Sequence, residues 1–197
     1  MRPVGGPVTF LGSFPGAPPE TGLPEVAFAG RSNVGKSSAI NRLLDQRAAA
    51  RVSSRPGRTQ LINLFRVGDR LVFADLPGYG FAAVPEEVLA SWKPMIEAYL
   101  GERDALRLVV ILIDGAIEAQ AIDTVLIEGL RGFDMPLCVV ATKMDKLSKH
   151  QRKPALAALR ARHGLDEDEL LPFSARTGDG CDEVWARILA ACGVRTR

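Results

Sequence analysis

Short apolar runs alternate with longer amphipathic stretches along most of the chain. From Glu25 onward, the short β-branched or apolar runs predict strands, and stretches with apolar positions three and four residues apart predict helices. The predicted strands cover residues 26–30, 61–67, 70–75, 108–113, 137–142 and 170–174. The predicted helices cover residues 36–45, 85–100, 118–131, 149–163 and 180–191.

This order of elements is typical of an α/β fold. The link over residues 67–70 is too short for a crossover, so the second and third strands should form an antiparallel hairpin. Each remaining strand is followed by a helix, which favours right-handed crossovers and parallel strands. We therefore expect three layers: a six-stranded, mostly parallel sheet with one antiparallel edge strand, and helices on both faces.

The first residues have a different composition. Residues 1–25 contain six prolines and five glycines, which disfavour a regular helix and predict an extended or turn-rich arm. We therefore expect an N-terminal extension over residues 1–24, one domain over residues 25–192 and a basic tail over residues 193–197.

Length and composition narrow the class of protein. The 197 residues suit a single domain, and 47% hydrophobic with 24% charged residues is typical of a globular chain. The net charge of +2 lacks the strong basic excess of a dedicated nucleic-acid binder. No apolar run reaches the ~20 residues that span a bilayer, and the N-terminus lacks a signal-peptide pattern, so we expect a cytoplasmic protein without a membrane partner. The three cysteines match neither a metal site nor a disulfide framework.

The most specific motif lies directly after the first predicted strand. Residues 30–37 read GRSNVGKS, a complete G-x-x-x-x-G-K-S that opens a helix. Its glycines let the backbone wrap around a polyphosphate, and the helix N-terminus attracts the negative charge. Lys36 would reach the β- and γ-phosphates, and the Ser37 hydroxyl would bind Mg²⁺ directly.

Two further motifs follow predicted strands in matching positions. Residues 75–78 read D-x-x-G, in which Asp75 would hold Mg²⁺ through water and the Gly78 amide would contact the γ-phosphate. Residues 142–145 read T-K-x-D, and the carboxylate of Asp145 can accept hydrogen bonds from two donors of guanine that adenine lacks. Taken alone, Asp145 is equally compatible with a surface ion pair; in register with the other motifs it favours GTP over ATP.

Weaker signals complete a nucleotide site. Ser174-Ala175 matches an S-A element that contacts the guanine O6, and Thr59 lies in a loop where it would bind Mg²⁺ when the γ-phosphate is present; a plain turn threonine is the alternative. Lys36, Thr59 and Gly78 are the candidate catalytic residues. The candidate nucleotide-binding residues are Gly30, Arg31, Ser32, Asn33, Val34, Gly35, Lys36, Ser37, Ser38, Gly57, Arg58, Thr59, Asp75, Gly78, Thr142, Lys143, Asp145, Ser174 and Ala175.

With these residues in place, the chain resembles the EngB/YsxC family of ribosome-biogenesis GTPases. The stretches that carry the resemblance are residues 26–38, 56–65, 75–82, 92–100 and 142–148. The resemblance implies one Ras-like P-loop GTPase domain that acts late in the assembly of the large ribosomal subunit and that is linked to growth, cell division and septation. Two departures stand out: Asp114-Gly115-Ala116-Ile117 replaces the usual D-x-R-H, and Ala39 replaces a bulky apolar residue.

Hydrolysis should be slow. Tyr79 follows D-x-x-G where Ras-like enzymes place a water-positioning glutamine, so we expect an intrinsic rate at or below roughly 10⁻³ per second. Asn33 stands where related GTPases hold a K⁺ ion, so K⁺ could stimulate turnover; a loop amide without a ligand is the alternative.

Basic residues gather around the predicted switch loop. Residues 42–70 hold seven arginines against two aspartates, a local charge of +5 that suits ribosomal RNA, although such a run is also compatible with a solvated face. The candidate RNA contacts are Arg51, Arg55 and Arg58. A monomer is the default expectation.

Two other functions remain open. One is an ATP-dependent metabolic phosphotransferase, which the T-K-x-D element disfavours. The other is a septum-associated or signalling GTPase that acts through protein partners without RNA.

Overall fold

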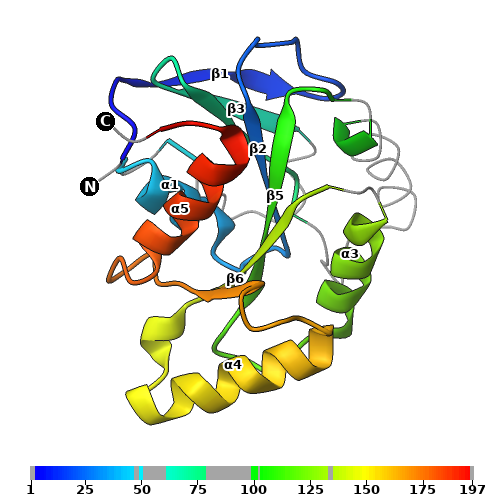
Figure 1. The fold of residues 1–197 in the computed structure, drawn as a ribbon, viewed down its shortest axis with the longest axis vertical. Coiled ribbons are helices and arrows are strands. Elements are labelled where there is room, and N and C mark those ends of the chain that lie inside the picture. The colour runs from blue at the N-terminus through cyan, green and yellow to red at the C-terminus, as the bar shows by residue number, and fades with distance from the viewer. Residues whose placement is uncertain are drawn as a thin grey trace.

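The structure is a computed structural model that describes residues 3–46, 49–50, 61–78, 99–101, 103–132 and 135–195. Its strands form one seven-stranded sheet in the order β1-β3-β4-β2-β5-β6-β7 (Figure 1). The strands are β1 (Val8–Phe14), β2 (Glu25–Gly30), β3 (Ile62–Val67), β4 (Leu71–Asp75), β5 (Leu106–Asp114), β6 (Leu137–Thr142) and β7 (Leu170–Pro172). The helices are α1 (Lys36–Leu43), α3 (Ala121–Arg131), the 3₁₀ turn η1 (Met144–Lys146), α4 (Lys149–His163) and α5 (Cys181–Cys192).

The predicted α/β class is confirmed, and so is the hairpin. Strands β3 and β4 pair antiparallel, while β2 pairs parallel with both β4 and β5. Each predicted strand is present within two or three residues of its expected bounds, as are the helices α1, α3, α4 and α5. The predicted helix over residues 85–100 lies outside the described residues except at its end.

The predicted number of strands, six, is wrong, and so is the prediction that the antiparallel strand forms the edge of the sheet. Residues 8–14, within the segment read as an extension, form β1, which pairs antiparallel with β3. The antiparallel strand β3 is therefore covered and does not form the edge of the sheet. The sequence gives no alternating signal for β1, because Phe10 and Leu11 are both exposed and the register of the pair shifts between Phe10 and Gly12.

Glycines allow the arm to cross the β3–β4 turn. The Gly68 amide donates a hydrogen bond to the Pro7 carbonyl oxygen at 2.8 Å. Gly68 has a φ of +55°, and a Cβ atom on it would lie against the Gly5 backbone. The close approach of the two backbones therefore requires a residue without a side chain at position 68.

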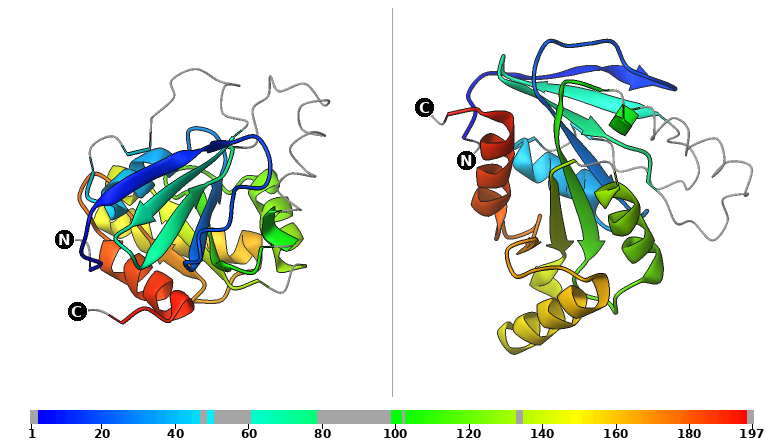
Figure 2. Two further views of the ribbon diagram at one scale, coloured as in Figure 1. Left: turned by 90° about the horizontal axis from the view of Figure 1, so that it is seen from above. Right: turned by 45° about the vertical axis from the view of Figure 1, so that its right-hand side comes forward.

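The sheet separates two apolar layers. Along β2, Val26 and Phe28 pack with residues of α1 and α5, whereas Ala27 and Ala29 pack with residues of α3 and α4. This alternation follows from the two-residue period of a strand, and it explains why β2, covered on both faces, is apolar throughout. Figure 2 shows α1 and α5 on one side of the sheet and α3 on the other. The carboxyl ends of β2, β4, β5 and β6 meet at one edge of this sheet, where binding sites of such folds form.

Candidate nucleotide-binding site

The loop after β2 is built to approach a ligand with its backbone. A Cβ atom on Gly30 would lie 2.8 Å from the Leu112 carbonyl oxygen, so only glycine fits between the loop and β5. Asn33 and Gly35 have φ values of +64° and +100°, which turn the backbone before α1 begins at Lys36. No side chain caps α1, and its first turn contains no acidic residue. No described side chain thus caps its N-terminal amides, and uncapped amides at a helix N-terminus suit an anion.

The D-x-x-G residues lie against this loop. The Lys36 amine donates to the Asp75 carboxylate, and both side chains are about nine-tenths buried. A Cβ atom on Gly78 would lie 2.9 Å from the Ser32 hydroxyl oxygen, which shows how closely the two motifs approach. The Leu76 amide donates to the Phe28 carbonyl oxygen at 3.1 Å and continues the pairing of β4 with β2. Parallel pairing thus brings together residues about forty positions apart in the sequence.

The T-K-x-D residues are bound to the same loop. The Thr142 hydroxyl donates to the Val34 carbonyl oxygen at 2.6 Å, and the Lys143 amine donates to the Asn33 carbonyl oxygen at 2.7 Å. Lys143 has a φ of +59°, which ends β6 and turns the chain into η1. The loops that follow the carboxyl ends of β2 and β6 therefore form a single surface.

Asp145 is held by the S-A element. The Ser174 hydroxyl donates to Asp145 Oδ1 at 2.7 Å, and Arg176 lies 3.8 Å from Asp145 Oδ2. The hydrogen bond from Ser174 is the main cause that lowers the pKa of Asp145 from its ordinary value. Asp145 is therefore an ionised acceptor at neutral pH, as a carboxylate that reads guanine must be.

The turn that carries Ser174 and Ala175 is tightly fixed. Ser174 is fully buried, and its hydroxyl oxygen also accepts a hydrogen bond from the Thr177 amide at 3.2 Å. Gly180 has a φ of +80°, and a Cβ atom there would overlap the Pro172 carbonyl oxygen. The turn therefore positions Ser174 through its backbone as well as through its hydrogen bonds.

Comparisons with known proteins agree with this geometry. Residues 25–143 match the model of a family described as 50S ribosome-binding GTPase. A probable GTP-binding protein EngB of Geobacter metallireducens is 52% identical over 171 residues, which cover 87% of this chain and 83% of that protein. Another from Exiguobacterium sibiricum is 45% identical, with 86% of this chain and 89% of that protein covered.

The chain belongs to the EngB family of GTP-binding proteins. A crystal structure of a probable GTP-binding protein EngB superposes with a TM-score of 0.72 at 27% identity, covering 87% of this chain and all of that one. Era of Aquifex aeolicus bound to GDP and AlF₄⁻ has a TM-score of 0.68 at 23% identity, covering 86% of this chain and 57% of that one. The second likeness concerns the fold alone. No helix among the described residues is long and apolar enough to span a membrane.

Several predicted site residues of this EngB-family chain lie outside the described residues. They are Gly57, Arg58 and Thr59 of the predicted switch loop, Arg51 and Arg55 beside them, and Tyr79. The described part of the candidate site thus comprises the loop after β2, the D-x-x-G residues, and the T-K-x-D and S-A residues that are predicted to contact guanine.

Two acidic residues that sequence reasoning missed contact the site. Asp114, at the end of β5, accepts a hydrogen bond from the Lys143 amine at 2.6 Å and is 8% exposed. Asp123, buried in the first turn of α3, forms an ion pair with Arg31 at 3.0 Å. The Arg31 side chain therefore points toward α3, and only its backbone remains available to the phosphate loop. Only the position of Asp114 at the carboxyl end of a central strand could have indicated it from the sequence. No sequence feature indicated Asp123.

Proposed function

We propose that this chain binds GTP and GDP with Mg²⁺, hydrolyses GTP slowly and acts as a nucleotide switch late in the assembly of the large ribosomal subunit. The observation that carries the proposal is the contact of Asp145 with Ser174 beside a phosphate loop tied to Thr142 and Lys143. A phosphotransferase that selects adenine has no use for an ionised carboxylate at this position.

Phosphate binding uses the backbone of residues 30–38 and the side chain of Lys36. The amides of the loop and of the first turn of α1 would surround the β-phosphate. The Lys36 amine would leave the Asp75 carboxylate and bind the β- and γ-phosphates, because its flexible side chain would reach either partner. The Gly78 amide, beside Ser32, would then contact the γ-phosphate.

The oxygen donors at this edge fit Mg²⁺. Ser37 and Thr59 would bind it directly and Asp75 through water, with phosphate oxygens as the remaining ligands. The described residues contain no group of three or more His, Cys, Asp or Glu side chains that could hold a metal, which agrees with a cation that shares its ligands with the nucleotide. When bound, Mg²⁺ neutralises charge on the transferred phosphoryl group.

Guanine recognition uses both loops after β6 and β7. Asp145 would accept hydrogen bonds from the N1–H and the exocyclic amine of guanine, and the Ala175 amide would donate to O6. Lys143, held by Asn33 and Asp114, would lie along the base. Because Ser174 already orients Asp145, this side chain would lose little further conformational freedom when the nucleotide binds, so the entropy cost of binding is small.

The proposal also includes slow hydrolysis that K⁺ activates. Tyr79 cannot position water as glutamine does, so a positive charge must come from elsewhere. The exposed Asn33 turns out of the loop with a left-handed backbone, and its amide oxygen suits a K⁺ ligand. We expect faster turnover in KCl than in NaCl at equal ionic strength, and loss of that difference in Asn33→Ala. Equal rates in both salts would exclude K⁺ activation.

The family supports a ribosomal role. Its model is described as ribosome-binding, and Arg51, Arg55 and Arg58 precede the predicted switch threonine, Thr59, where the γ-phosphate would control an RNA contact. A monomer that acts on assembling subunits would work in the cytoplasm, and its loss would impair growth, division and septation.

Co-sedimentation with purified large ribosomal subunits tests the function. The protein would be loaded with GDP, with a non-hydrolysable GTP analogue or with neither, at two salt concentrations. Binding that requires the GTP analogue and weakens steeply with salt is expected. Absence of binding in every state would contradict the ribosomal role and leave the septum-associated GTPase that acts through protein partners.

A further inference from the structure

The phosphate loop, residues 30–37, is fixed to both faces of the sheet. Gly30 packs against the backbone of β5 too closely for any side chain, so the loop leaves the sheet at the next residue. The Val34 side chain is buried in the apolar layer that contains residues of α1 and α5. The Arg31 side chain extends to Asp123 in α3, on the other face. These two side chains therefore anchor the loop from opposite sides.

The contact between Arg31 and Asp123 is a buried ion pair. Arg31 Nε lies 3.0 Å from Asp123 Oδ1 and 3.2 Å from Asp123 Oδ2, so it donates to both carboxylate oxygens. The side chain of Asp123 is 2% exposed and that of Arg31 is 17% exposed. Asp123 lies in the first turn of α3, where the helix dipole favours a negative charge. The Arg31 side chain is therefore held at a defined point of the helix.

Stability alone does not account for this ion pair. Removing two charges from water is unfavourable, and their attraction offsets that penalty only when the geometry is good. An apolar pair of the same volume would therefore stabilise the fold as well or better. An ion pair differs from an apolar contact because the guanidinium must keep its donors aimed at the carboxylate. What the pair adds to the fold is thus a fixed direction for the Arg31 side chain.

The direction of this side chain constrains the backbone that follows it. The Arg31 carbonyl oxygen accepts a hydrogen bond from the Val34 amide at 3.2 Å, which closes a turn over residues 31–34. Ser32, inside this turn, is the residue that Gly78 approaches. A rotation of the backbone at Arg31 would therefore move the amides of the turn relative to both α1 and the D-x-x-G residues.

We propose that Asp123 is a positioning residue that holds the phosphate loop in its binding conformation through Arg31. Asp123 itself does not touch the nucleotide. Its carboxylate keeps the loop amides oriented for the β-phosphate, so less conformational freedom is lost when GDP or GTP binds. The inference rests on the proposed binding of guanine nucleotides and is independent of the ribosomal role.

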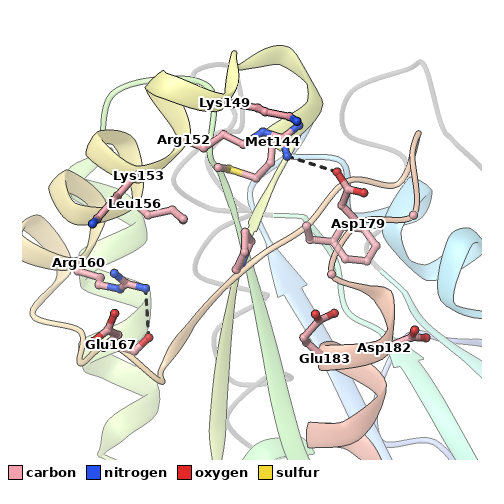
Figure 3. A pocket seen from close by; sticks show the side chains of 14 residues that line it. Met144, Lys149, Arg152, Lys153, Leu156, Arg160, Glu167, Asp179, Asp182 and Glu183 are labelled. Carbon is pink, nitrogen blue, oxygen red and sulfur yellow. Dashed lines mark hydrogen bonds and ion pairs between the residues drawn. The ribbon is translucent and has the colours of Figure 1, made fainter.

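An exposed ion pair elsewhere provides a matched comparison. Arg152 of α4 lies 3.3 Å from Asp179, in the turn after β7, and Figure 3 shows this contact across a groove of about 780 Å³. The two side chains are 33% and 55% exposed. Because water screens the attraction between exposed charges, this pair should position its turn only weakly.

The contribution of the β-phosphate to affinity tests the inference. Displacement of a fluorescent GDP analogue gives the dissociation constants of GDP and GMP, which differ by the phosphate that the loop would surround. In Asp123→Asn we expect GDP to bind about tenfold more weakly, while GMP binds within about twofold of its wild-type affinity. Asp123→Glu, which keeps the carboxylate, should recover part of the loss. The matched control Asp179→Asn removes the same charge and should leave both affinities within about twofold of the wild-type values.

A double variant shows whether Asp123 acts through Arg31. Arg31→Gln and Asp123→Asn should each weaken the binding of GDP. The combined variant should lose no more affinity than the more affected single variant, because the same interaction is removed in all three. Additive losses would mean that Asp123 affects the nucleotide by another route, and would overturn the inference.

Thermal melting of each variant separates positioning from folding. A purely structural role would lower the melting temperature and leave the ratio of GDP affinity to GMP affinity at its wild-type value. An unchanged ratio in folded Asp123→Asn would overturn the inference; if that variant does not fold, the ratio in Arg31→Gln decides in the same way. Wild-type protein that binds no GDP would overturn the proposed function together with this inference. Binding of GDP without binding to large subunits would overturn the ribosomal role alone.

Discussion

Single contacts set the ionisation of Asp145, the residue proposed to recognise guanine. Asp145 is surrounded by a hydroxyl donor and a cation from the turn after β7, and both favour its ionised form. The Ser174 side chain thus orients the carboxylate, and under the proposed function the Ala175 amide would face the base.

Removing the Ser174 hydroxyl should change the pH range of nucleotide binding. The depressed pKa keeps Asp145 ionised as the pH falls, and guanine affinity is lost only when the pH passes through that pKa. In Ser174→Ala the pKa rises toward its ordinary value, so GDP affinity should begin to fall at a higher pH than in the wild-type protein. Dissociation constants for GDP measured between about pH 4 and pH 7, with the folded fraction checked at each pH, would show this. If GDP affinity depends on pH in the same way in both proteins, the prediction is contradicted.

At the scale of elements, the sequence predicted the parts of the site that single loops form. The phosphate loop was recognisable because its glycines, Lys36 and Ser37 lie within eight residues after a strand. The strand β1 was not, because its side chains show no regular alternation and its pairing with β3 joins residues 48 to 59 positions apart. Asp114 and Asp123 were missed for the same reason, since their partners belong to other elements.

The packing of α3 against α4 should make stability sensitive to pH. His163 is 2% exposed, its Nδ1 lies 2.8 Å from the Thr124 hydroxyl oxygen, and its Nε2 has no hydrogen-bond partner among the described residues. Burial lowers the pKa of His163, so the unfolded chain binds the proton more readily than the folded chain. The contribution of neutral His163 is present above the ordinary pKa of ~6.5 and is lost as the pH falls below it.

His163→Gln should remove part of that pH dependence. Glutamine retains a polar group for Thr124 but does not titrate, so the difference in unfolding free energy between pH 8 and pH 5.5 should be smaller than in the wild-type protein. His150→Gln, at an exposed position of the same helix, is the matched control and should leave the difference unchanged. Urea titrations at pH 8 and pH 5.5 measure these free energies. If the difference between the two pH values is the same in the wild type and in His163→Gln, then His163 is not the group responsible.

At the scale of the whole molecule, a buried charge cluster joins the arm to the sheet. Glu25, at the start of β2, is fully buried and accepts hydrogen bonds from Arg103 at 2.6 and 2.7 Å and from the Tyr99 hydroxyl at 2.8 Å. Arg103 also donates to the carbonyl oxygens of Pro18 and Pro19. Burial and the carboxylate of Glu25 both raise the pKa of Tyr99, which therefore stays a neutral donor. One arginine thus connects the N-terminal segment, β2 and the approach to β5.

Replacing Glu25 should destabilise the protein strongly. Glu25→Gln leaves Arg103 as a buried cation without its main partner, which costs about 3 kcal/mol or more in unfolding free energy. Arg103 also contacts Glu20, whose side chain is 67% exposed, and Glu20→Gln should cost less than about 1 kcal/mol. Denaturant unfolding compares the two. Equal losses would show that burial of the ion pair does not control this junction.

The central claim is that Asp145 selects guanine, and a change of nucleotide specificity tests it most directly. Xanthine carries a carbonyl oxygen where guanine carries its amino group, so an amide at position 145 would complement xanthine as a carboxylate complements guanine. Binding of GTP and XTP to the wild-type protein and to Asp145→Asn should be measured by fluorescence competition. The account predicts that Asp145→Asn loses roughly 100-fold or more in GTP affinity and gains a preference for XTP. If Asp145→Asn keeps the wild-type affinity for GTP and still binds GTP more tightly than XTP, the claim is contradicted.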